Sequence, residues 1–213
     1  MSNYGTKHYE AGKHLLCYLQ GTRSRGVIYG NCPNPYPIFT SFTDSDWAMS
    51  EGRKSVSGFV VMCANGPIAW SSKQQVVVAL SSCEAEYLAC SHNARQVIWL
   101  RSLFEEIGFA QNSPTPLYCD NQGTVICTHD PQSHSRMKHI DIRAHFIRDS
   151  VNRKLIDVHH IPGSENPADL MTKLLHRTIH QKWILQIFMH DDLPNEIACT
   201  APTGHRSRGG VGT

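Results

Sequence analysis

The sequence of 213 residues has no apolar run that approaches the roughly 20 residues needed to cross a bilayer. Its start, Met1 to His8, contains no apolar segment, so we expect no secretory signal and an intracellular protein. None of its eight cysteines forms a C-x-x-C pair, which favours reduced thiols over a disulfide framework. A phosphate-binding glycine-rich loop, a G-x-S-x-G nucleophile motif and internal repeats are also missing.

Charge is nearly balanced overall but uneven along the chain. The net charge is only +2, so we do not expect the whole molecule to attract polyanions strongly. The stretch from Ser133 to Lys154 nevertheless carries six basic residues against two acids. Such a local basic face suits a phosphate-backed substrate, although a solvated helix face gives the same pattern. His134, His139 and His145 lack a cysteine pair at zinc-like spacing, so we predict no structural zinc site.

The apolar fraction of 40% is enough for one core. Leu15, Leu16 and Leu19 fall on one side of a helix predicted over Lys7–Gln20, and a short strand is predicted over Gly26–Gly30. This piece is too small to fold alone. The predicted organisation is a terminal piece over 1–30, a proline-rich linker over 31–37, a main domain over 38–175, a helix over 176–189 and a disordered tail over 190–213.

The main domain reads as a sheet that begins with three antiparallel strands. Ala64-Asn65-Gly66-Pro67 is a tight hairpin signal in which Asn-Gly supplies positive φ. The longest helix starts at a capping box and allows a break near Ser91–Asn93. The predicted strands are 38–44, 57–63, 68–71, 116–119 and 155–161, and the predicted helices are 82–108, 122–127 and 138–153. In the helix 82–108 the predicted core positions are Leu88, Val97, Leu100, Phe104 and Ile107. In the helix 138–153 they are Ile142, His145, Phe146 and Val151.

Four acids recur where strands end or helices begin. Asp44 ends the first predicted strand and Asp120 follows the fourth. Glu86 lies near the start of the long helix, and Asp169 lies in the first turn of a helix that Asn166 caps. A carboxylate at a strand end is held rigidly at a rim that ligands can reach. We therefore expect these four acids to come together.

Each of these acids has a neighbour or a structural role that offers an alternative. Asp46 lies two residues after Asp44, and an Asp-x-Asp pair is common in turns. Glu84 lies two residues before Glu86, but Glu84 already serves in the capping box with Ser81. Glu86 lies roughly 200° around the helix from Glu84 and is left without that explanation. A first-turn acid such as Asp169 also stabilises its own helix.

Seven motifs follow one another in the main domain, and they are specific as a set. They are T-D-S-D-W-A at 43–48, R-K-S-V-S-G-F at 53–59, I-A-W-S-S-K-Q at 68–74, A-L-S-S-C-E-A-E-Y at 79–87, L-Y-C-D-N at 117–121, K-H-I-D-I at 138–142 and A-D-L-M-T-K at 168–173. With these motifs in this order, the chain resembles the ribonuclease H domain of copia-type retrotransposon polyproteins. Residues 6–30 are similar to the C-terminal edge of the preceding reverse transcriptase.

The resemblance implies an α/β fold of the ribonuclease H-like kind. Its mixed five-stranded sheet would combine an antiparallel 1-2-3 meander with parallel strands 4 and 5, flanked by helices. It also implies hydrolysis of the RNA strand of an RNA–DNA hybrid. By motif position the catalytic and metal-binding carboxylates would be Asp44, Glu86, Asp120 and Asp169.

The chemistry of such a site demands cations. At ~4 Å and an effective dielectric of ~20, each pair of like charges costs about 4 kcal/mol. Acid-rich oxygen ligands suit Mg²⁺ or Mn²⁺, and two such ions can activate water and stabilise the leaving oxygen at phosphorus. Near the acids, Ser45 and Asn121 are candidate contacts to the substrate. The candidate phosphate contacts in the basic stretch are Arg136, Lys138 and Arg143.

Two features keep an alternative open. The loop 162–167 lacks the histidine that many ribonucleases H carry before the last acid, while His159 and His160 lie on the preceding strand. The chain also has no Tyr-x-Asp-Asp polymerase motif, so it would be a fragment of a mobile element. The alternative function is therefore an inactive nucleic-acid-binding remnant. We expect a reverse transcriptase domain upstream in a longer polyprotein, and a location in the cytoplasm, a virus-like particle or the nucleus.

Overall fold

The computed structural model describes residues 5–30, 38–47, 52–129 and 141–188. The chain divides into two compact units, one with residues 1–26 and 190–213 and the other with residues 27–189. The described part of the first unit is helix α1, Thr6–Gly21, where a helix was predicted. The linker 31–37 and the tail 190–213 were predicted to be irregular, and both lie outside the described residues. None of the described helices combines the length and apolar character that a bilayer crossing requires.

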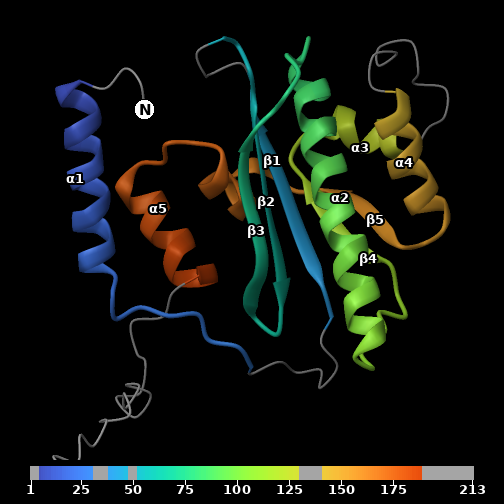
Figure 1. Cartoon of the computed structure of the whole chain (residues 1–213). Helices are drawn as coiled ribbons and strands as arrows, with labels where there is room; N and C mark the ends of the chain where they lie inside the picture. The colour runs from blue at the N-terminus through green and yellow to red at the C-terminus, as the bar shows by residue number, and fades with distance from the viewer. Residues whose placement is uncertain (1–4, 31–37, 48–51, 130–140, 189–213) are drawn as a thin grey trace, which may run out of the picture. The chain divides into compact units, whose positions relative to one another are not determined.

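The second unit is built on one five-stranded sheet (Figure 1). Its strand order is β3-β2-β1-β4-β5. β1 pairs antiparallel with β2 and parallel with β4, β2 pairs antiparallel with β3, and β4 pairs parallel with β5. This arrangement confirms the predicted fold class. The strands are β1 Thr40–Asp46, β2 Val56–Cys63, β3 Gly66–Gln74, β4 Thr115–Cys119 and β5 Ile156–His160.

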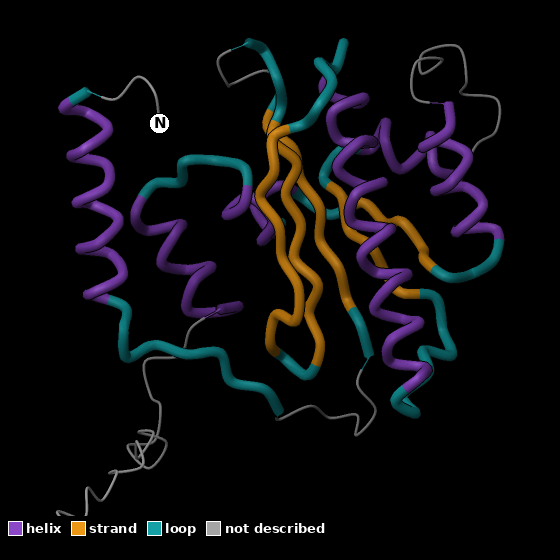
Figure 2. The backbone as a smooth tube through the Cα atoms, in the orientation of Figure 1, coloured by secondary structure: helices purple, strands orange, loops and turns teal. Residues whose placement is uncertain are grey.

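Helices cover both faces of this sheet (Figure 2). On one face Phe59 and Val61 of β2 join the main core with helix α2, while on the other face Val60 packs with Trp183 and Ile184. Because side chains alternate along a strand, β2 is buried from both sides. The helices are α2 Ser82–Glu106, α3 Gln122–His129, α4 Asp141–Asn152, the 3₁₀ turns η3 Gly163–Glu165 and η4 Pro167–Met171, α5 Arg177–Trp183 and the π-turn η5 Ile184–Phe188.

The β2–β3 hairpin was predicted correctly, but the residues that adopt positive φ differ from those predicted. Ala64 and Asn65 have φ of 50° and 63°, so the positive φ values fall on the two residues before Gly66. The strand predicted over Gly26–Gly30 is wrong. This stretch forms no ladder beyond a single bridge, although the Gly30 amide donates to the Ala64 carbonyl at 2.9 Å. Residues 27–30 consequently belong to the second unit rather than to the terminal piece.

Three further predictions need correction. Helix α2 runs unbroken through Ser91–Asn93, and the fully buried Asn93 donates its side-chain amide to the Phe42 carbonyl of β1 at 3.2 Å. Ile107 does not face the core but is 57% exposed where α2 ends. His145 is exposed, and the core position of α4 is Ile147 instead. In α2 the polar Asn93 is buried and the apolar Ile107 is exposed, each the opposite of what its character suggested.

Candidate active site

Two of the four acids are brought together by strand pairing. Thr43 of β1 lies opposite Cys119 of β4 in a parallel register, so the next residues along lie side by side, Asp44 still within β1 and Asp120 just after β4. Asp44 is fully buried, whereas Asp120 is half-buried. One side-chain oxygen each of Asp44, Asp120 and Asp169 lie within 4.8 Å of one another. The carboxyl ends of β1 and β4 therefore form the floor of an acidic cluster.

Glu86 reaches the cluster from α2, which covers the main-core face of the sheet. It lies in the second turn of α2, and its Oε1 accepts hydrogen bonds from the Ser45 amide at 3.0 Å and the Ser45 hydroxyl at 3.2 Å. The Cys119 thiol donates to its Oε2 at 3.8 Å. Glu86, Cys119 and Asp120 also offer ligand atoms within 4.8 Å of one another. Ser45 of β1 and Cys119 of β4 thus hold the Glu86 carboxylate in place.

Asp169 is supplied by η4, which packs over β1 and β2. The buried Asn166 caps this turn by accepting from the Ala168 amide at 3.2 Å, as predicted, and it donates to the Thr43 carbonyl at 2.9 Å. Gly58 makes the close approach possible. A Cβ there would lie 2.6 Å from side-chain atoms of both Met171 and Thr172.

Two residues after η4 contact the acids directly. The Thr172 hydroxyl donates to Asp44 Oδ2. The Lys173 ammonium donates to Asp44 Oδ1 at 3.0 Å and to Asp169 Oδ1 at 2.6 Å. Both carboxylate oxygens of the buried Asp44 are therefore bonded to side chains from the segment that carries Asp169. This segment is one of the sequence motifs, but no role was predicted for Thr172 or Lys173. The four-residue spacing from Asp169 to Lys173, typical of a helical ion pair, was the available signal.

Burial and mutual repulsion make these acids reluctant to ionise. Burial first, and then the charges of Asp44 and Asp120, raise the pKa of Glu86 well above its usual value. Burial and the charge of Asp44 likewise raise the pKa of Asp120. Burial also raises the pKa of Asp169, against the opposing hydrogen bond from Lys173. A bound cation therefore stabilises the ionised form of such a cluster.

The two alternative acids lie elsewhere. Asp46 ends β1, and its Oδ1 accepts from the Val56 amide of the paired strand at 2.6 Å. Glu84 accepts from the Leu80 amide at 2.8 Å, and its own amide donates to the Ser81 hydroxyl at 3.2 Å. The Ser81 half of the predicted capping box therefore forms, whereas the Glu84 carboxylate binds the amide one residue before the N-cap. The metal-capable groups found among the described residues contain neither of these acids.

The candidate substrate contacts have mixed placements. Ser45 is buried against Glu86, so in this structure its side chain holds a carboxylate. Asn121 is half-buried and accepts from the Thr124 amide at 2.9 Å, as a cap of α3. Arg143 is exposed on α4, whereas Arg136 and Lys138 lie outside the described residues. His160 Nε2 lies 3.2 Å from the Asp120 carbonyl, and His159 lies 3.2 Å from Asp157.

A basic cavity of about 100 Å³ lies beside the sheet end. Ser57, the partner of Ser45 in the β1–β2 ladder, contributes to its wall. Its basic lining residues are Lys73, His92, Arg95 and Arg143. Burial and then the charges of Arg95 and Lys73 lower the pKa of His92, so the positive charge of the cavity comes mainly from its lysine and arginines. A phosphate group is the kind of ligand that such a pocket attracts.

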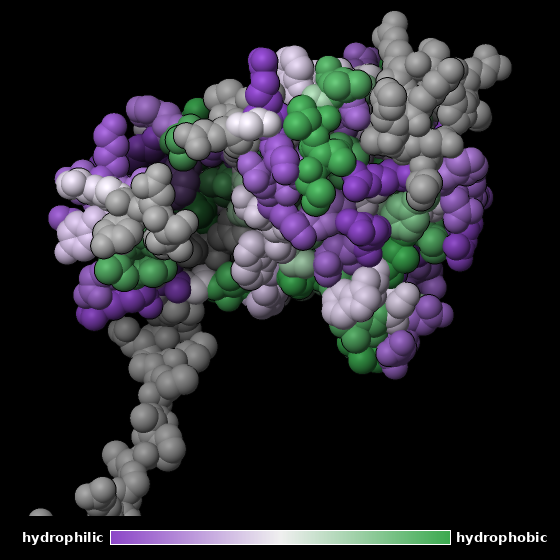
Figure 3. Space-filling model, turned by 45° about the horizontal axis from the view of Figure 1, so that its top comes forward, coloured by the Kyte–Doolittle hydropathy of each residue, from purple (hydrophilic) through white to green (hydrophobic). Residues whose placement is uncertain are grey.

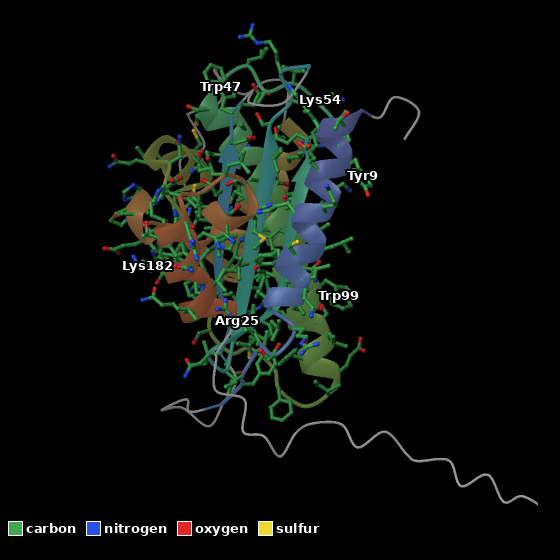
Figure 4. The ribbon with its side chains drawn as sticks, turned by 90° about the vertical axis from the view of Figure 1, so that its left-hand side faces the viewer. Tyr9, Arg25, Trp47, Lys54, Trp99 and Lys182 are labelled. Atoms are coloured by element: carbon green, nitrogen blue, oxygen red, sulfur yellow. The ribbon has the colours of Figure 1, made fainter. Side chains whose placement is uncertain are left out.

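Two labelled side chains mark the end of the second unit at which β1 ends. Trp47 and Lys54 lie at the same end of the molecule, while Trp99 lies toward the other (Figure 4). The Trp47 indole donates to the Ala79 carbonyl at 3.3 Å, which ties the end of β1 to the loop before α2. Figure 3 shows hydrophilic residues over much of the face that comes forward, with a smaller apolar area among them.

The donor set fits a hard divalent cation. Asp44, Asp120 and Asp169 offer oxygens, which Mg²⁺ and Mn²⁺ prefer. Cys119 could offer sulfur, but burial and then the charge of Glu86 raise the pKa of its thiol well above the usual value. A thiol that keeps its proton and donates it to Glu86 is a poor ligand. The residues present therefore favour magnesium or manganese over zinc.

Comparison with known proteins places the chain among the homologues of Pol polyproteins. The chain is 38% identical over 178 residues to the retrovirus-related Pol polyprotein from transposon TNT 1-94 of Nicotiana tabacum, and the match covers 83% of the chain. It is 37% identical over 184 residues to the retrovirus-related Pol polyprotein from transposon RE1 of Arabidopsis thaliana. The chain is a homologue of retrotransposon Pol polyproteins. It spans only 13% and 12% of the lengths of these two relatives.

Among solved structures, this Pol homologue is similar to LC11-RNase H1, isolated from compost. The identity is 17%, the TM-score is 0.48, and the match covers 63% of this chain and 92% of the other. The same ribonuclease in complex with an RNA/DNA hybrid gives 16% identity and a TM-score of 0.44. No protein-family model matches the chain.

Proposed function

We propose that this Pol homologue is a metal-dependent ribonuclease H that hydrolyses the RNA strand of RNA–DNA hybrids. The observation that carries the proposal is the convergence of Asp44, Asp120 and Asp169 within 4.8 Å, with Glu86 joined to Asp120 through the second group. The sequence motifs point to the same four acids. The proposed partner in a longer polyprotein is a reverse transcriptase domain.

In this proposal Asp44, Glu86, Asp120 and Asp169 hold two Mg²⁺ or Mn²⁺ ions. When bound, such ions supply a polarised water and charge stabilisation at phosphorus. The protein's own part is to keep the four carboxylates in one place against their mutual repulsion. Ser45 does this for Glu86 through two hydrogen bonds. Hydrolysis adds water across the P–O3′ bond and leaves a 5′-phosphate and a 3′-hydroxyl.

Substrate binding is assigned to the basic cavity. Lys73, Arg95 and Arg143 line it, and its wall includes Ser57 of the strand next to Asp44. Phosphates of the hybrid would lie there while a neighbouring phosphodiester of the RNA strand meets the acids. The alternative, an inactive remnant that binds nucleic acid, would use the same cavity without the cut.

The test is cleavage of an RNA–DNA hybrid whose RNA strand is labelled, with Mg²⁺ and with EDTA. We expect the wild-type chain to cut only with Mg²⁺, and Asp120→Asn to leave the RNA intact. Asp157→Asn is the matched control, since Asp157 lies on the adjacent strand β5 in contact with His159. DNA and RNA duplexes should stay uncut. A folded protein that shifts the hybrid on a gel and does not cut it would establish the binding remnant instead.

A further inference from the structure

The Lys173 ammonium lies on the oxygens that a divalent cation would need. It donates to Asp44 Oδ1 at 3.0 Å and to Asp169 Oδ1 at 2.6 Å. Together with Asp120, these two residues offer oxygens within 4.8 Å of one another. An ion held by Asp44 and Asp169 together would compete with the ammonium for the same lone pairs.

The fold places this lysine with several contacts. Asn166 ties the start of η4 to the backbone of β1, and Gly58 lets the end of η4 approach β2. Thr172 donates to the other oxygen of Asp44. Lys173 follows directly, so its backbone is anchored while its side chain remains 38% exposed. A long side chain on an anchored backbone can exchange its partners without unfolding the segment.

The charges also favour this position. Burial alone would lower the pKa of Lys173, but the hydrogen bond to Asp169 and the charge of Asp44 outweigh it and raise the pKa. Lys173 in turn opposes the upward pKa shifts of Glu86 and Asp120. One ammonium thus moderates the repulsion within the whole cluster.

We propose that Lys173 is an internal cation that competes with the divalent cation for Asp44 and Asp169, and that ion binding displaces its ammonium toward solvent. The lysine keeps the acids together until the ion arrives and sets the ion concentration at which the site fills. The inference rests on the proposed function, because it takes these carboxylates as ligands of a divalent cation.

The test measures Mn²⁺ binding to the purified full-length chain by calorimetry, with no nucleic acid present. Lys173→Met removes the charge and keeps an unbranched stem. We expect it to bind Mn²⁺ at least about tenfold more tightly, the factor that one charge-assisted hydrogen bond represents. Its melting temperature should be lower than that of the wild type in EDTA and should match it in saturating Mn²⁺. Lys182→Met is the matched control, since Lys182 lies on α5 over the Trp183 ring and should leave affinity unchanged (Figure 4).

A second variant keeps the test sharp if Lys173→Met does not fold. Lys173→Arg retains the charge and presents a planar fork that can bind two carboxylates, so it should weaken Mn²⁺ binding. Equal or weaker Mn²⁺ binding by Lys173→Met would overturn the inference and make Lys173 an anchor of the bound state. A wild-type chain that binds Mn²⁺ no better than Asp120→Asn would instead refute the proposed function.

Discussion

The end of β1 and the start of α2 have similar sequences, but the acid that lies at the cluster is the first of the pair on β1 and the second of the pair on α2. Each carries two acids separated by one residue, Asp44 and Asp46 on the strand and Glu84 and Glu86 on the helix. In each region one acid binds a backbone amide, Val56 for Asp46 and Leu80 for Glu84. The other acid faces the cluster.

The comparison shows how the same side chain serves stability in one place and chemistry in the next. Asp46 and Glu84 satisfy backbone donors at the edge of their elements, which is what acids do at caps and strand ends. Glu86 lies buried near Asp44 and Asp120, and burial first, and then the charges of these two acids, raise its pKa. A buried acid that lies against other acids costs stability, and such a cost is typical of functional sites.

Replacing each of the two aspartates in turn should give the largest difference between these roles. Asp44→Asn should lower the rate of hybrid cleavage by roughly a thousandfold or more, because it removes one charge from the cation site. Asp46→Asn should keep the rate within about threefold, since only a strand-end hydrogen bond weakens. Single-turnover rates in Mg²⁺ measure both. Comparable losses in the two variants would show that the strand end acts as one unit, contrary to the geometry.

Gly58→Ala tests how the last acid is placed. Its Cβ would lie 2.6 Å from atoms of Met171 and Thr172, so η4 must move away from β2. We expect a loss of about 1–3 kcal/mol in the free energy of unfolding, as for other overpacked cores. Mn²⁺ affinity should fall as well, because Asp169 moves with η4. Urea unfolding and calorimetry give the two quantities, and an unchanged affinity would mean that Asp169 does not depend on this packing.

The two glutamates should respond in opposite directions. Glu84→Gln loses a charge at the start of α2, which should cost roughly 0.3–1 kcal/mol of stability without loss of cleavage. Glu86→Gln keeps the shape and removes a repelled charge, so it should stabilise the protein in EDTA while abolishing cleavage. Chemical denaturation beside the cleavage assay makes the comparison. If Glu86→Gln destabilised the chain, the view that Glu86 is strained by its neighbours would be wrong.

The smallest expected effect is the change with pH in the free energy of unfolding, measured in EDTA. The pKa of Glu86 is raised in the folded protein above its ordinary 4.5, so between the two values the folded state binds more protons than the unfolded state. Stability is therefore fully present at the acidic side of this window and is lost as pH rises through the folded pKa. Glu86→Gln should flatten that slope. A wild-type profile that climbs over the same window would contradict the assignment.

Much of the site was predictable because its geometry is local. Its position after a strand identified Asp120. Asp44 was expected to end the first strand, and that reason is wrong because β1 continues to Asp46, although Asp44 does lie in the cluster. The role of Glu84 beside the Ser81 cap left Glu86 for another role. Parallel pairing of β1 with β4 then places the two aspartates together, as the resemblance implied.

The supporting residues were not predictable from local pattern. Ser45 was expected at the substrate and instead holds Glu86, because odd-numbered residues of β1 face α2. His145 was expected in the core and is exposed, since Ile147 takes the buried side of α4. Lys173 pairs with Asp169 at a local four-residue spacing, but it meets Asp44 only when η4 packs on β1 and β2, a contact that no pattern within either segment reveals.

The hydrogen bond from Asn166 to Thr43 spans 123 positions of the chain. During synthesis Asp44 is made long before Asn166 and Asp169, so the acidic cluster cannot exist until the ribosome has passed this point. Closing so long a loop is slow compared with forming α2 or the β2–β3 hairpin. Competence to bind a divalent cation should therefore appear late in folding, as the sheet receives its last segment. A growing chain would be protected from early metal capture simply by the order in which its residues emerge.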